Sequence, residues 1–233
     1  MITVDDFTIY WLVSHYIARQ SLLWKVMFDM TITIKEKRKE QHRLEILQAA
    51  EQVFARQGYH TTTMEEVAEE CGWSKGTLYL YFKSKEDLFF SIMLEKMDQF
   101  SNTLLPELKA SEDIHVMIAA LVNAHFGFFS ENKDFFQLVL SEQGKVMHSS
   151  DSGLREKMIN QQHTQLYNIS KTMSEALPSC CAIDANILTA SIIGAINLQL
   201  VNWIMAGEAI ELESTKQQII ILFTNGIQCD EKN

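Results

Sequence analysis

The chain has 233 residues, of which 47% are hydrophobic, and a formal net charge of −10 at pH 7. This length allows a sizeable buried core, and the low number of helix breakers, two prolines and nine glycines, favours a nearly all-helical protein over a β-rich one. The acidic charge argues against a protein coated in nucleic acid, although residues 35–90 are close to charge balance and leave room for a local basic surface.

The N-terminal stretch is not expected to be a targeting signal or a membrane span. Residues 7–28 are apolar and aromatic, but Arg19 and Lys25 interrupt them, and Asp5 and Asp6 precede them where a signal peptide would be basic. A membrane-spanning helix needs about 20 consecutive, predominantly apolar residues. Neither class of segment therefore fits this stretch.

A regular helical pattern begins at Lys35. Apolar side chains at helical spacing predict a first helix that ends at Gln57 and Gly58. Thr63 can cap a second, short helix, Glu66 would complete a capping box, and Gly72 would end it. The predicted buried stripe of this second helix consists of Met64, Val67, Ala68 and Cys71.

A third short helix and a long fourth helix follow. Ser74 can cap the segment SKGTLYLYF, and Ser84 with Asp87 would form a capping box at the start of the long helix, whose end lies near Pro106. Leu78 and Phe82, four residues apart, would point inward. Two short helices joined by a glycine-containing turn, with a longer helix on either side, are typical of a helix-turn-helix unit.

The third helix has the residue types that DNA recognition requires. The N–H groups of its first turn can bind phosphate, a glycine lets the backbone approach the duplex closely, and lysine, threonine and tyrosine side chains can reach phosphates or base edges. The alternative is a small structural helix with core aromatic side chains and solvated lysines.

From Glu45 to Leu88 the sequence resembles the DNA-binding domain of the tetracycline-repressor (TetR/AcrR) family. The residues that carry the resemblance are ILQAAEQVFARQGYHTTTMEEVAEECGWSKGTLYLYFKSKEDL. The resemblance implies a homodimeric, ligand-responsive transcription factor, usually a repressor, that binds double-stranded DNA. It implies that the DNA-facing residues are Thr62, Thr63, Ser74, Lys75, Gly76, Thr77, Tyr79, Tyr81 and Lys85.

Two residues depart from the family pattern. Trp73 is much larger than the small apolar residue common before the serine cap, and Leu80 replaces a residue that is often polar. The turn must therefore make room for the Trp73 ring or expose it. Leu80 could contact a thymine methyl group or be partly buried against protein. Alanine in place of Lys85 or Tyr79 is expected to lower operator affinity and leave dimerisation intact.

The resemblance also suggests a division of the chain. Residues 1–34 would be an N-terminal extension, residues 35–88 the DNA-binding domain, residues 89–228 the ligand-sensing and dimerisation domain, and residues 229–233 a tail. The family's short basic arm would correspond to MTITIKEKRKEQ, which starts at Met30. The residues before Met30 would then come from an upstream start, or they would form an extra helix.

Five further helices are expected over residues 114–130, 134–143, 153–177, 184–206 and 214–227. Residues 185–207 carry no charge and are long enough to span a membrane, but their asparagines and glutamine favour a helix buried in protein. Because this helix is apolar around its circumference, we expect a symmetry mate to cover one side, with a central helix of a monomer as the alternative. The expected dimerisation residues are Ile187, Ser191, Gly194, Leu198, Val201, Ile220 and Phe223.

An effector pocket for an apolar or amphipathic small molecule is expected within the C-terminal helices. Such pockets are lined mainly by apolar and aromatic side chains with a few polar groups. Each candidate residue could equally belong to the core. The candidates are Phe100, His125, Phe126, Phe129, Phe136, Met158, His163, Tyr167 and Trp203.

No motif indicates an enzyme, a metal site or a cofactor. The sequence contains no HExxH, no glycine-rich phosphate loop and no CxxC or Cys/His finger spacing. We therefore expect a reduced, cytoplasmic transcription regulator without catalytic residues, metal or cofactor. Adjacent Cys180 and Cys181 could sense oxidants or be ordinary thiols. An activator or architectural DNA-binding protein without small-molecule sensing is the second hypothesis, and an enzyme on a helical scaffold is the third.

Overall fold

The computed structural model describes residues 33–146, 152–178, 183–206 and 211–226. All regular secondary structure in these ranges is helical, which confirms the all-α prediction. The chain divides into two compact units, Met1–Ile46 and Leu47–Asn233. Residues 1–32 of the predicted extension, Cys180, Cys181 and the predicted C-terminal tail lie outside the described residues.

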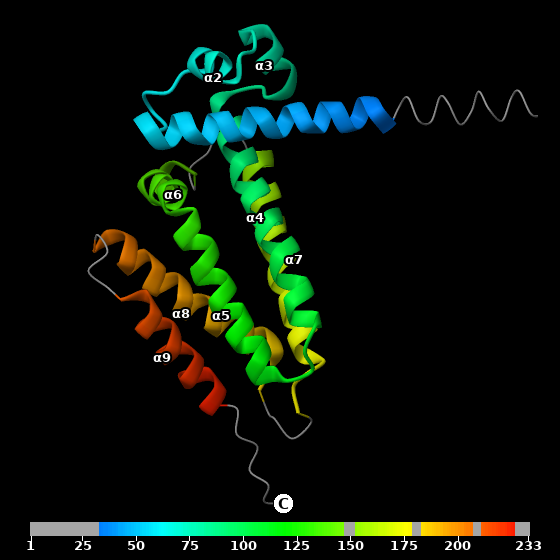
Figure 1. Ribbon diagram of the computed structural model, residues 1–233, viewed down its shortest axis with the longest axis vertical. Helices are drawn as coiled ribbons and strands as arrows, with labels where there is room; N and C mark the ends of the chain where they lie inside the picture. The colour runs from blue at the N-terminus through cyan, green and yellow to red at the C-terminus, as the bar shows by residue number, and fades with distance from the viewer. Residues whose placement is uncertain (1–32, 147–151, 179–182, 207–210, 227–233) are drawn as a thin grey trace, which may run out of the picture. The chain divides into compact units, whose positions relative to one another are not determined.

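The helices follow the predicted order (Figure 1). A first helix covers residues 33–57 and ends before Gly58, as expected. The expected bounds of the later helices differ from the observed ones by three residues at most, and the start of α5 is the expected one. The labelled helices are α2 (Met64–Cys71), α3 (Lys75–Tyr81), α4 (Lys85–Lys109), α5 (Ile114–Glu131), α6 (Lys133–Val146), α7 (Ser152–Ser174), α8 (Ala185–Met205) and α9 (Leu212–Asn225).

Local capping explains where the short helices begin and end. Thr63 and Glu66 form the predicted capping box at α2, with the Glu66 carboxylate accepting from the Thr63 N–H at 2.8 Å. Gly72 ends α2 at φ 70°, a left-handed conformation that strains residues with a side chain. At the start of α4 only one of the two hydrogen bonds of the predicted capping box is present. The Ser84 hydroxyl accepts from the Asp87 N–H, but the Asp87 carboxylate accepts from the Lys83 N–H and not from Ser84.

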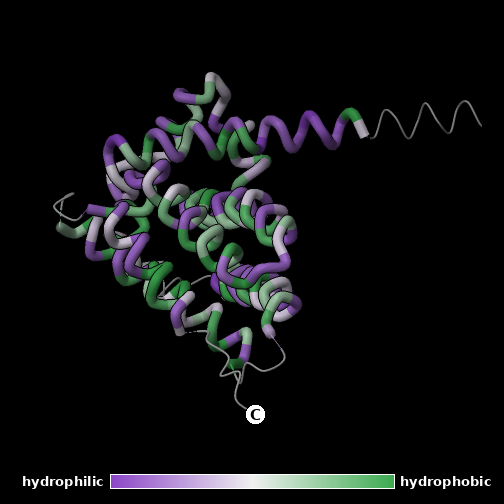
Figure 2. The backbone as a smooth tube through the Cα atoms, turned by 60° about the horizontal axis from the view of Figure 1, so that its bottom comes forward, coloured by the Kyte–Doolittle hydropathy of each residue, from purple (hydrophilic) through white to green (hydrophobic). Residues whose placement is uncertain are grey.

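The longer helices of the second unit share one hydrophobic core. Helix α4 packs against α5 and α7, α8 packs against α7, and α9 packs against α5 (Figure 1). Hydrophobic residues recur along these helices, whereas residues 33–46 of the first unit are mainly polar (Figure 2). The centre of the core consists of fully buried aliphatic and aromatic side chains, among them Leu104, Ile118, Leu121, Phe126, Met173, Ile192, Ile196 and Leu200.

Two of the described helices, α5 and α8, are long and apolar enough to cross a membrane by length and composition alone. Both contribute to the core cluster, and the polar Asn186 side chain of α8 accepts a hydrogen bond from Ser170 of α7 at 2.7 Å. Buried core helices of globular proteins have the same apolar composition. One side of α8 is therefore buried in protein as expected, whereas the opposite side is not covered by the described residues of this chain.

Candidate DNA-binding and effector sites

Helix α3 is held in place by the contacts that its sequence predicts. The Ser74 hydroxyl accepts from the Thr77 N–H at 3.1 Å and caps the helix. Leu78 is fully buried and Phe82 is 2% exposed, so both point inward as expected. The opposite face of this short helix is thereby left on the surface.

The exposed face of α3 carries an aromatic and aliphatic surface. Leu80 is 80% exposed and Tyr79 45% exposed, so Leu80 is not buried against its own chain. The half-buried Trp73 packs edge-on against Tyr81, with ring centroids 6.3 Å apart. The large side chain before the serine cap is thus accommodated by a contact with one of the candidate DNA-facing residues.

Lys75 and Gly76 begin α3. The Lys75 ammonium is hydrogen-bonded and ion-paired with Glu65, which raises the pKa of Lys75 and lowers the pKa of Glu65. Gly76 is exposed, and a Cβ added there would meet only Ser74 Oγ, at an ordinary 3.9 Å. The fold itself therefore does not require glycine at this position, which fits a role in a close approach by another molecule.

The two threonines before α2 have structural roles. Thr62 is 1% exposed, and its hydroxyl donates to the Gly58 carbonyl at 2.8 Å. A side chain buried in this way cannot reach DNA, so its assignment to the DNA-facing set is wrong. Thr63 is exposed, but its hydroxyl is engaged in the α2 capping box.

Lys85 also differs from its expected role. Its ammonium donates to three backbone carbonyl groups, those of Tyr59 at 2.7 Å, His60 at 3.1 Å and Thr62 at 2.7 Å. It also lies over the Tyr59 ring, 4.7 Å from the centroid. All of these partners belong to the turn that leads into α2. In the structure Lys85 therefore fixes this turn to the start of α4 instead of facing outward.

Alanine in place of Tyr79 is expected to weaken operator binding with little effect on stability. Tyr79 is partly exposed, and substitutions at such surface positions usually change the free energy of unfolding by no more than about 0.5 kcal/mol. Fluorescence anisotropy with labelled operator DNA measures the loss of affinity, and urea unfolding measures stability. A Tyr79→Ala protein with unchanged operator affinity would contradict the assignment of this face to DNA.

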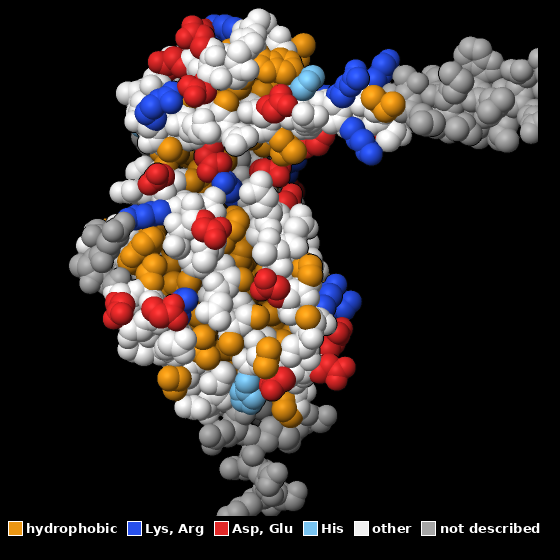
Figure 3. All heavy atoms as spheres, viewed as in Figure 1, with side chains coloured by type: hydrophobic (Ala, Val, Ile, Leu, Met, Phe, Trp, Pro, Cys, Tyr) orange, Lys and Arg blue, Asp and Glu red, His pale blue; other side chains and the backbone are white. Residues whose placement is uncertain are grey.

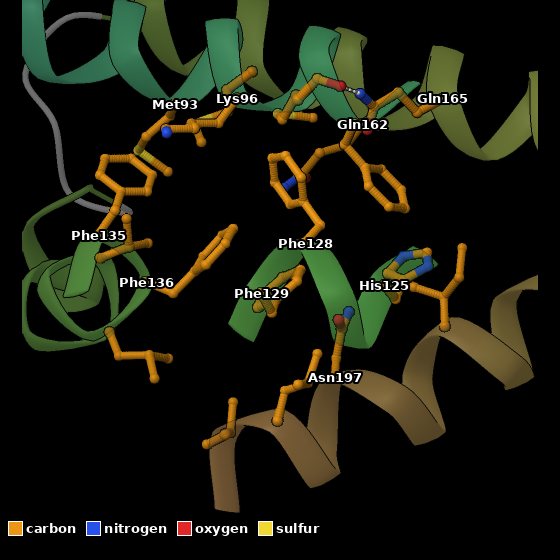
Figure 4. A pocket seen from close by; sticks show the side chains of 18 of the residues that line it. Met93, Lys96, His125, Phe128, Phe129, Phe135, Phe136, Gln162, Gln165 and Asn197 are labelled. Carbon is orange, nitrogen blue, oxygen red and sulfur yellow. Dashed lines mark hydrogen bonds between the residues drawn. The ribbon is translucent and has the colours of Figure 1, made fainter. Parts of the chain in front are cut away.

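A cavity of about 530 Å³ lies within the helical part of the second unit (Figure 4). Five of the nine predicted effector residues line it, namely Phe100, His125, Phe129, Phe136 and Met158. The other four do not. Phe126 belongs to the core, His163 and Tyr167 are exposed, and Trp203 is buried with the Lys133 ammonium 4.9 Å from its ring centroid.

The cavity is mainly aromatic, with a few polar groups. Phe129 and Phe136 stack with their centroids 3.7 Å apart, and Phe128 meets Phe136 edge-on at 6.0 Å. The polar lining residues that the sequence analysis missed are Lys96, Gln162, Gln165 and Asn197, of which Gln165 donates to the Met97 carbonyl at 2.5 Å. Lys96 and Met97 lie four and three residues before Phe100 on α4, so helical spacing from the predicted Phe100 would have found both of these lining residues.

His125 is a buried neutral side chain in the cavity wall. Its Nδ1 lies 3.0 Å from the Leu121 carbonyl oxygen, and because a carbonyl only accepts, Nδ1 carries the proton. Burial lowers the pKa of His125 to about 4, an effect that the hydrogen bond to Leu121 only partly opposes. The imidazole is therefore uncharged at neutral pH.

Because His125 is neutral in the folded protein, we expect the free energy of unfolding to depend on pH. Its folded-state pKa of about 4 lies below the unfolded value of 6.5, so the unfolded chain binds the proton first and stability falls as pH drops below 6.5. Between pH 7 and pH 5 this group should remove about 2 kcal/mol from the free energy of unfolding. Urea unfolding at both pH values should show a smaller loss for His125→Gln than for the natural chain, and equal losses would contradict a depressed pKa.

An exposed apolar stripe runs along α8. Ile187 is 67% exposed and Leu198 60% exposed, and the predicted Ser191 and Gly194 are also on the surface. Val201 instead lines the cavity. Figure 3 shows hydrophobic side chains (orange) on the side of the molecule where α8 and α9 lie.

On α9 the predicted interface residues Ile220 and Phe223 are less exposed than two of their neighbours. Ile220 and Phe223 are partly buried and pack against the core of their own chain. Their neighbours Ile221 and Leu222 are 55% and 65% exposed. Most of the exposed apolar surface of α9 therefore comes from Ile221 and Leu222, and the predicted pair remains a prediction for the interface.

The described residues contain no group of three or more His, Cys, Asp or Glu side chains that could hold a metal ion. Cys71, which was expected in the buried stripe of α2, is half-buried and unbridged.

Comparison with known proteins agrees with the helix-turn-helix geometry. Residues 46–92 match the family model described as "Bacterial regulatory proteins, tetR family". The fatty acid metabolism regulator protein of Bacillus subtilis (strain 168) is 26% identical over 194 residues, which cover 82% of this chain and 98% of that protein. The transcriptional activator FasR of Mycolicibacterium smegmatis is 30% identical over 101 residues, which cover 43% of this chain and 46% of FasR.

Solved structures show the same fold over most of the chain. The transcriptional regulator FadR from Bacillus subtilis, in complex with stearoyl-CoA, superposes with a TM-score of 0.67 and 26% identity over 79% of this chain and 99% of FadR. A TetR transcription regulator from Haloarcula marismortui shares only the fold, with a TM-score of 0.69 and 17% identity over 81% of this chain and 98% of that one. Together with the capped, outward-facing α3, these matches show that residues 46–92 are similar to the DNA-binding region of TetR-family proteins and that the chain has the fold of TetR-family transcriptional regulators.

Proposed function

We propose that the protein is a homodimeric transcriptional repressor that acts in the cytoplasm and leaves its palindromic operator when a long-chain acyl-CoA binds. The observation that carries this proposal is the phenylalanine-lined cavity in the helical part of a chain whose α3 is exposed. The relatives point to the same ligand class, because FadR from Bacillus subtilis was solved with stearoyl-CoA.

The chemistry of the cavity suits an acyl chain. Its volume of about 530 Å³ lies within the range of roughly 300–1,000 Å³ that is usual for small-molecule sites. Each methylene group removed from water contributes about 0.8 kcal/mol, so a long chain in an aromatic cavity gains affinity with length. Lys96, Gln162 and Asn197 are polar lining groups that can orient the ligand's polar end.

DNA binding requires two copies of α3. We infer a dimer through the exposed apolar surface of α8 and α9, where Ile187, Leu198, Met205, Ile221 and Leu222 are more than half exposed. In such a dimer the two α3 helices would enter successive major grooves, about 34–36 Å apart, or a somewhat larger span where two dimers share a site. Because phosphate contacts supply much of the affinity, binding should weaken steeply with salt.

The test is a titration of operator-bound protein with stearoyl-CoA, with free CoA as the control. We expect stearoyl-CoA, and not CoA, to release the labelled operator and to raise the melting temperature. A ligand at 100 times its Kd stabilises a protein by about 2.7 kcal/mol. No release and no stabilisation by any acyl-CoA between C8 and C20 would contradict the proposal.

The similarity to FasR, which is described as an activator, favours a second candidate in which the regulator raises transcription. Transcription from the target promoter in cells with and without the gene separates the two. A repressor predicts more transcript without the gene, and an activator predicts less. An architectural DNA-binding protein would show no stabilisation by acyl-CoA in the preceding test.

A further inference from the structure

One lysine among the described residues that line the cavity, Lys96, also contacts the helix over residues 33–57. Lys96 of α4 lies at the Phe135 end of the cavity, away from His125 (Figure 4). Its ammonium forms an ion pair with Glu51 Oε1 at 2.9 Å, and Glu51 belongs to the helix over residues 33–57. The same ammonium donates to Asn132 Oδ1, at the end of α5, at 2.5 Å.

The ion pair is largely sheltered from water. The Lys96 and Glu51 side chains are 14% and 25% exposed, and the ammonium lies 5.9 Å from the centroid of the Phe135 ring. Removing one member of a buried pair leaves an uncompensated charge, which is far less favourable than the pair itself. Any occupant of the cavity that withdraws Lys96 from Glu51 therefore changes the free energy of this helical contact.

An aromatic contact runs beside the ion pair. Phe135, which lines the cavity, lies 6.3 Å from Phe89 of α4, centroid to centroid. Phe89 in turn contacts Phe54 at 5.8 Å and Tyr59 at 5.1 Å. Tyr59 belongs to the turn that Lys85 fixes, so the Lys96 end of the cavity is in continuous contact with the turn leading into α2.

We propose that Lys96 is the residue through which an effector acts on DNA binding. An effector head group that presents an oxygen acceptor to Lys96 competes with Glu51 for the ammonium, and the loss of the Lys96–Glu51 pair weakens the DNA-binding arrangement. This inference rests on the proposed acyl ligand. It adds a specificity-determining residue, a requirement for an oxygen acceptor on the ligand, and the contact through which binding is transmitted.

The proposal predicts opposite changes in stearoyl-CoA affinity for substitutions of the two ion-pair partners, Glu51 and Lys96. Glu51→Gln removes the competitor, so Lys96 is released to the ligand and stearoyl-CoA should bind several-fold more tightly. Lys96→Met removes the ligand's partner, so stearoyl-CoA should bind several-fold more weakly. In both variants operator affinity should lose its dependence on the ligand. Binding of one ligand typically changes the affinity of a protein for a second ligand by about 5–150-fold. In both variants we expect this factor, for stearoyl-CoA and operator, to fall close to one.

The experiment measures operator affinity with and without stearoyl-CoA, and stearoyl-CoA affinity with and without operator. Both sets of measurements are made because stearoyl-CoA must change operator affinity by the same factor as operator changes stearoyl-CoA affinity. Glu70→Gln is the matched control, since it removes an ion pair of similar geometry, with Arg56 at 2.7 Å, that does not contact the cavity. It should keep the coupling of the natural chain.

The double variant Lys96→Met with Glu51→Gln leaves no buried charge and keeps the test valid if a single variant unfolds. It should bind operator without any response to the ligand. Adding stearate in place of stearoyl-CoA identifies the oxygen: release by stearate assigns it to a carboxylate, and release by stearoyl-CoA alone assigns it to the thioester or nucleotide part.

The outcomes separate the two proposals. If the natural chain shows no coupling between stearoyl-CoA and operator, the proposed function fails. If the natural chain is coupled, and Glu51→Gln, Lys96→Met and the double variant are all coupled to the same degree, the role of Lys96 is wrong and the proposed function stands.

Discussion

Alanine in place of Lys85 is expected to weaken operator binding by about tenfold or more, while the salt dependence of binding stays unchanged. The Lys85 ammonium donates to three carbonyl groups of the turn before α2, and hydrogen bonds to charged groups contribute about 1.5–3 kcal/mol each. Without them the turn loses its attachment to α4. Operator affinity should therefore fall because α2 and α3 are less well positioned, and not because a phosphate contact is lost.

The salt series distinguishes these two causes. Loss of one phosphate contact lowers the slope of log affinity against log salt by about 0.9. Lys83, two residues earlier and exposed, is the matched control, since alanine there should reduce the slope if the residue reaches a phosphate, and should leave the melting temperature unchanged. A reduced slope with unchanged stability in Lys85→Ala would show that Lys85 contacts DNA directly.

Alanine in place of Leu78 is expected to lower the free energy of unfolding by about 2–5 kcal/mol and to abolish specific operator binding at moderate temperature. Leu78 is fully buried beneath α3, and its removal leaves a cavity under a helix of only seven residues. Urea unfolding and operator anisotropy measure the two effects on the same protein.

Leu80 provides the control for Leu78, because the same chemical change is made two residues later on the same helix. Leu80 is 80% exposed, so Leu80→Ala should change the free energy of unfolding by no more than about 0.5 kcal/mol. It should affect operator binding alone. Equal destabilisation by the two substitutions would contradict the burial of Leu78 and the exposure of Leu80 on α3.

The helix caps that the sequence predicted correctly each depend on residues that are close to one another in the chain. The capping box of Thr63 and Glu66, the left-handed Gly72 and the cap of Ser74 each involve residues within a few positions of one another, and all three are present. The role of Lys85 could not be read in this way. Its partner Tyr59 lies 26 residues away, and only the folded turn brings three carbonyl groups to one ammonium.

Helices that are apolar on several sides explain most of the remaining errors. On α5 the sequence offers a run of aromatic residues, and spacing alone does not tell that Phe126 faces the core whereas Phe128 and Phe129 face the cavity. On α9 the five consecutive apolar residues 219–223 make the exposed pair, Ile221 and Leu222, indistinguishable in sequence from its buried and partly buried neighbours. In both helices the packing of other helices decides which side is exposed.

The preference of the purified protein for DNA sequence tests the central claim most directly. Selection from a random double-stranded pool, followed by sequencing, should yield one palindromic consensus whose half-sites lie about one helical turn or slightly more apart. Leu80→Ala should alter or weaken the selected half-site and leave the fold intact. Recovery of no preferred sequence at low salt would contradict the reading of DNA by the exposed face of α3.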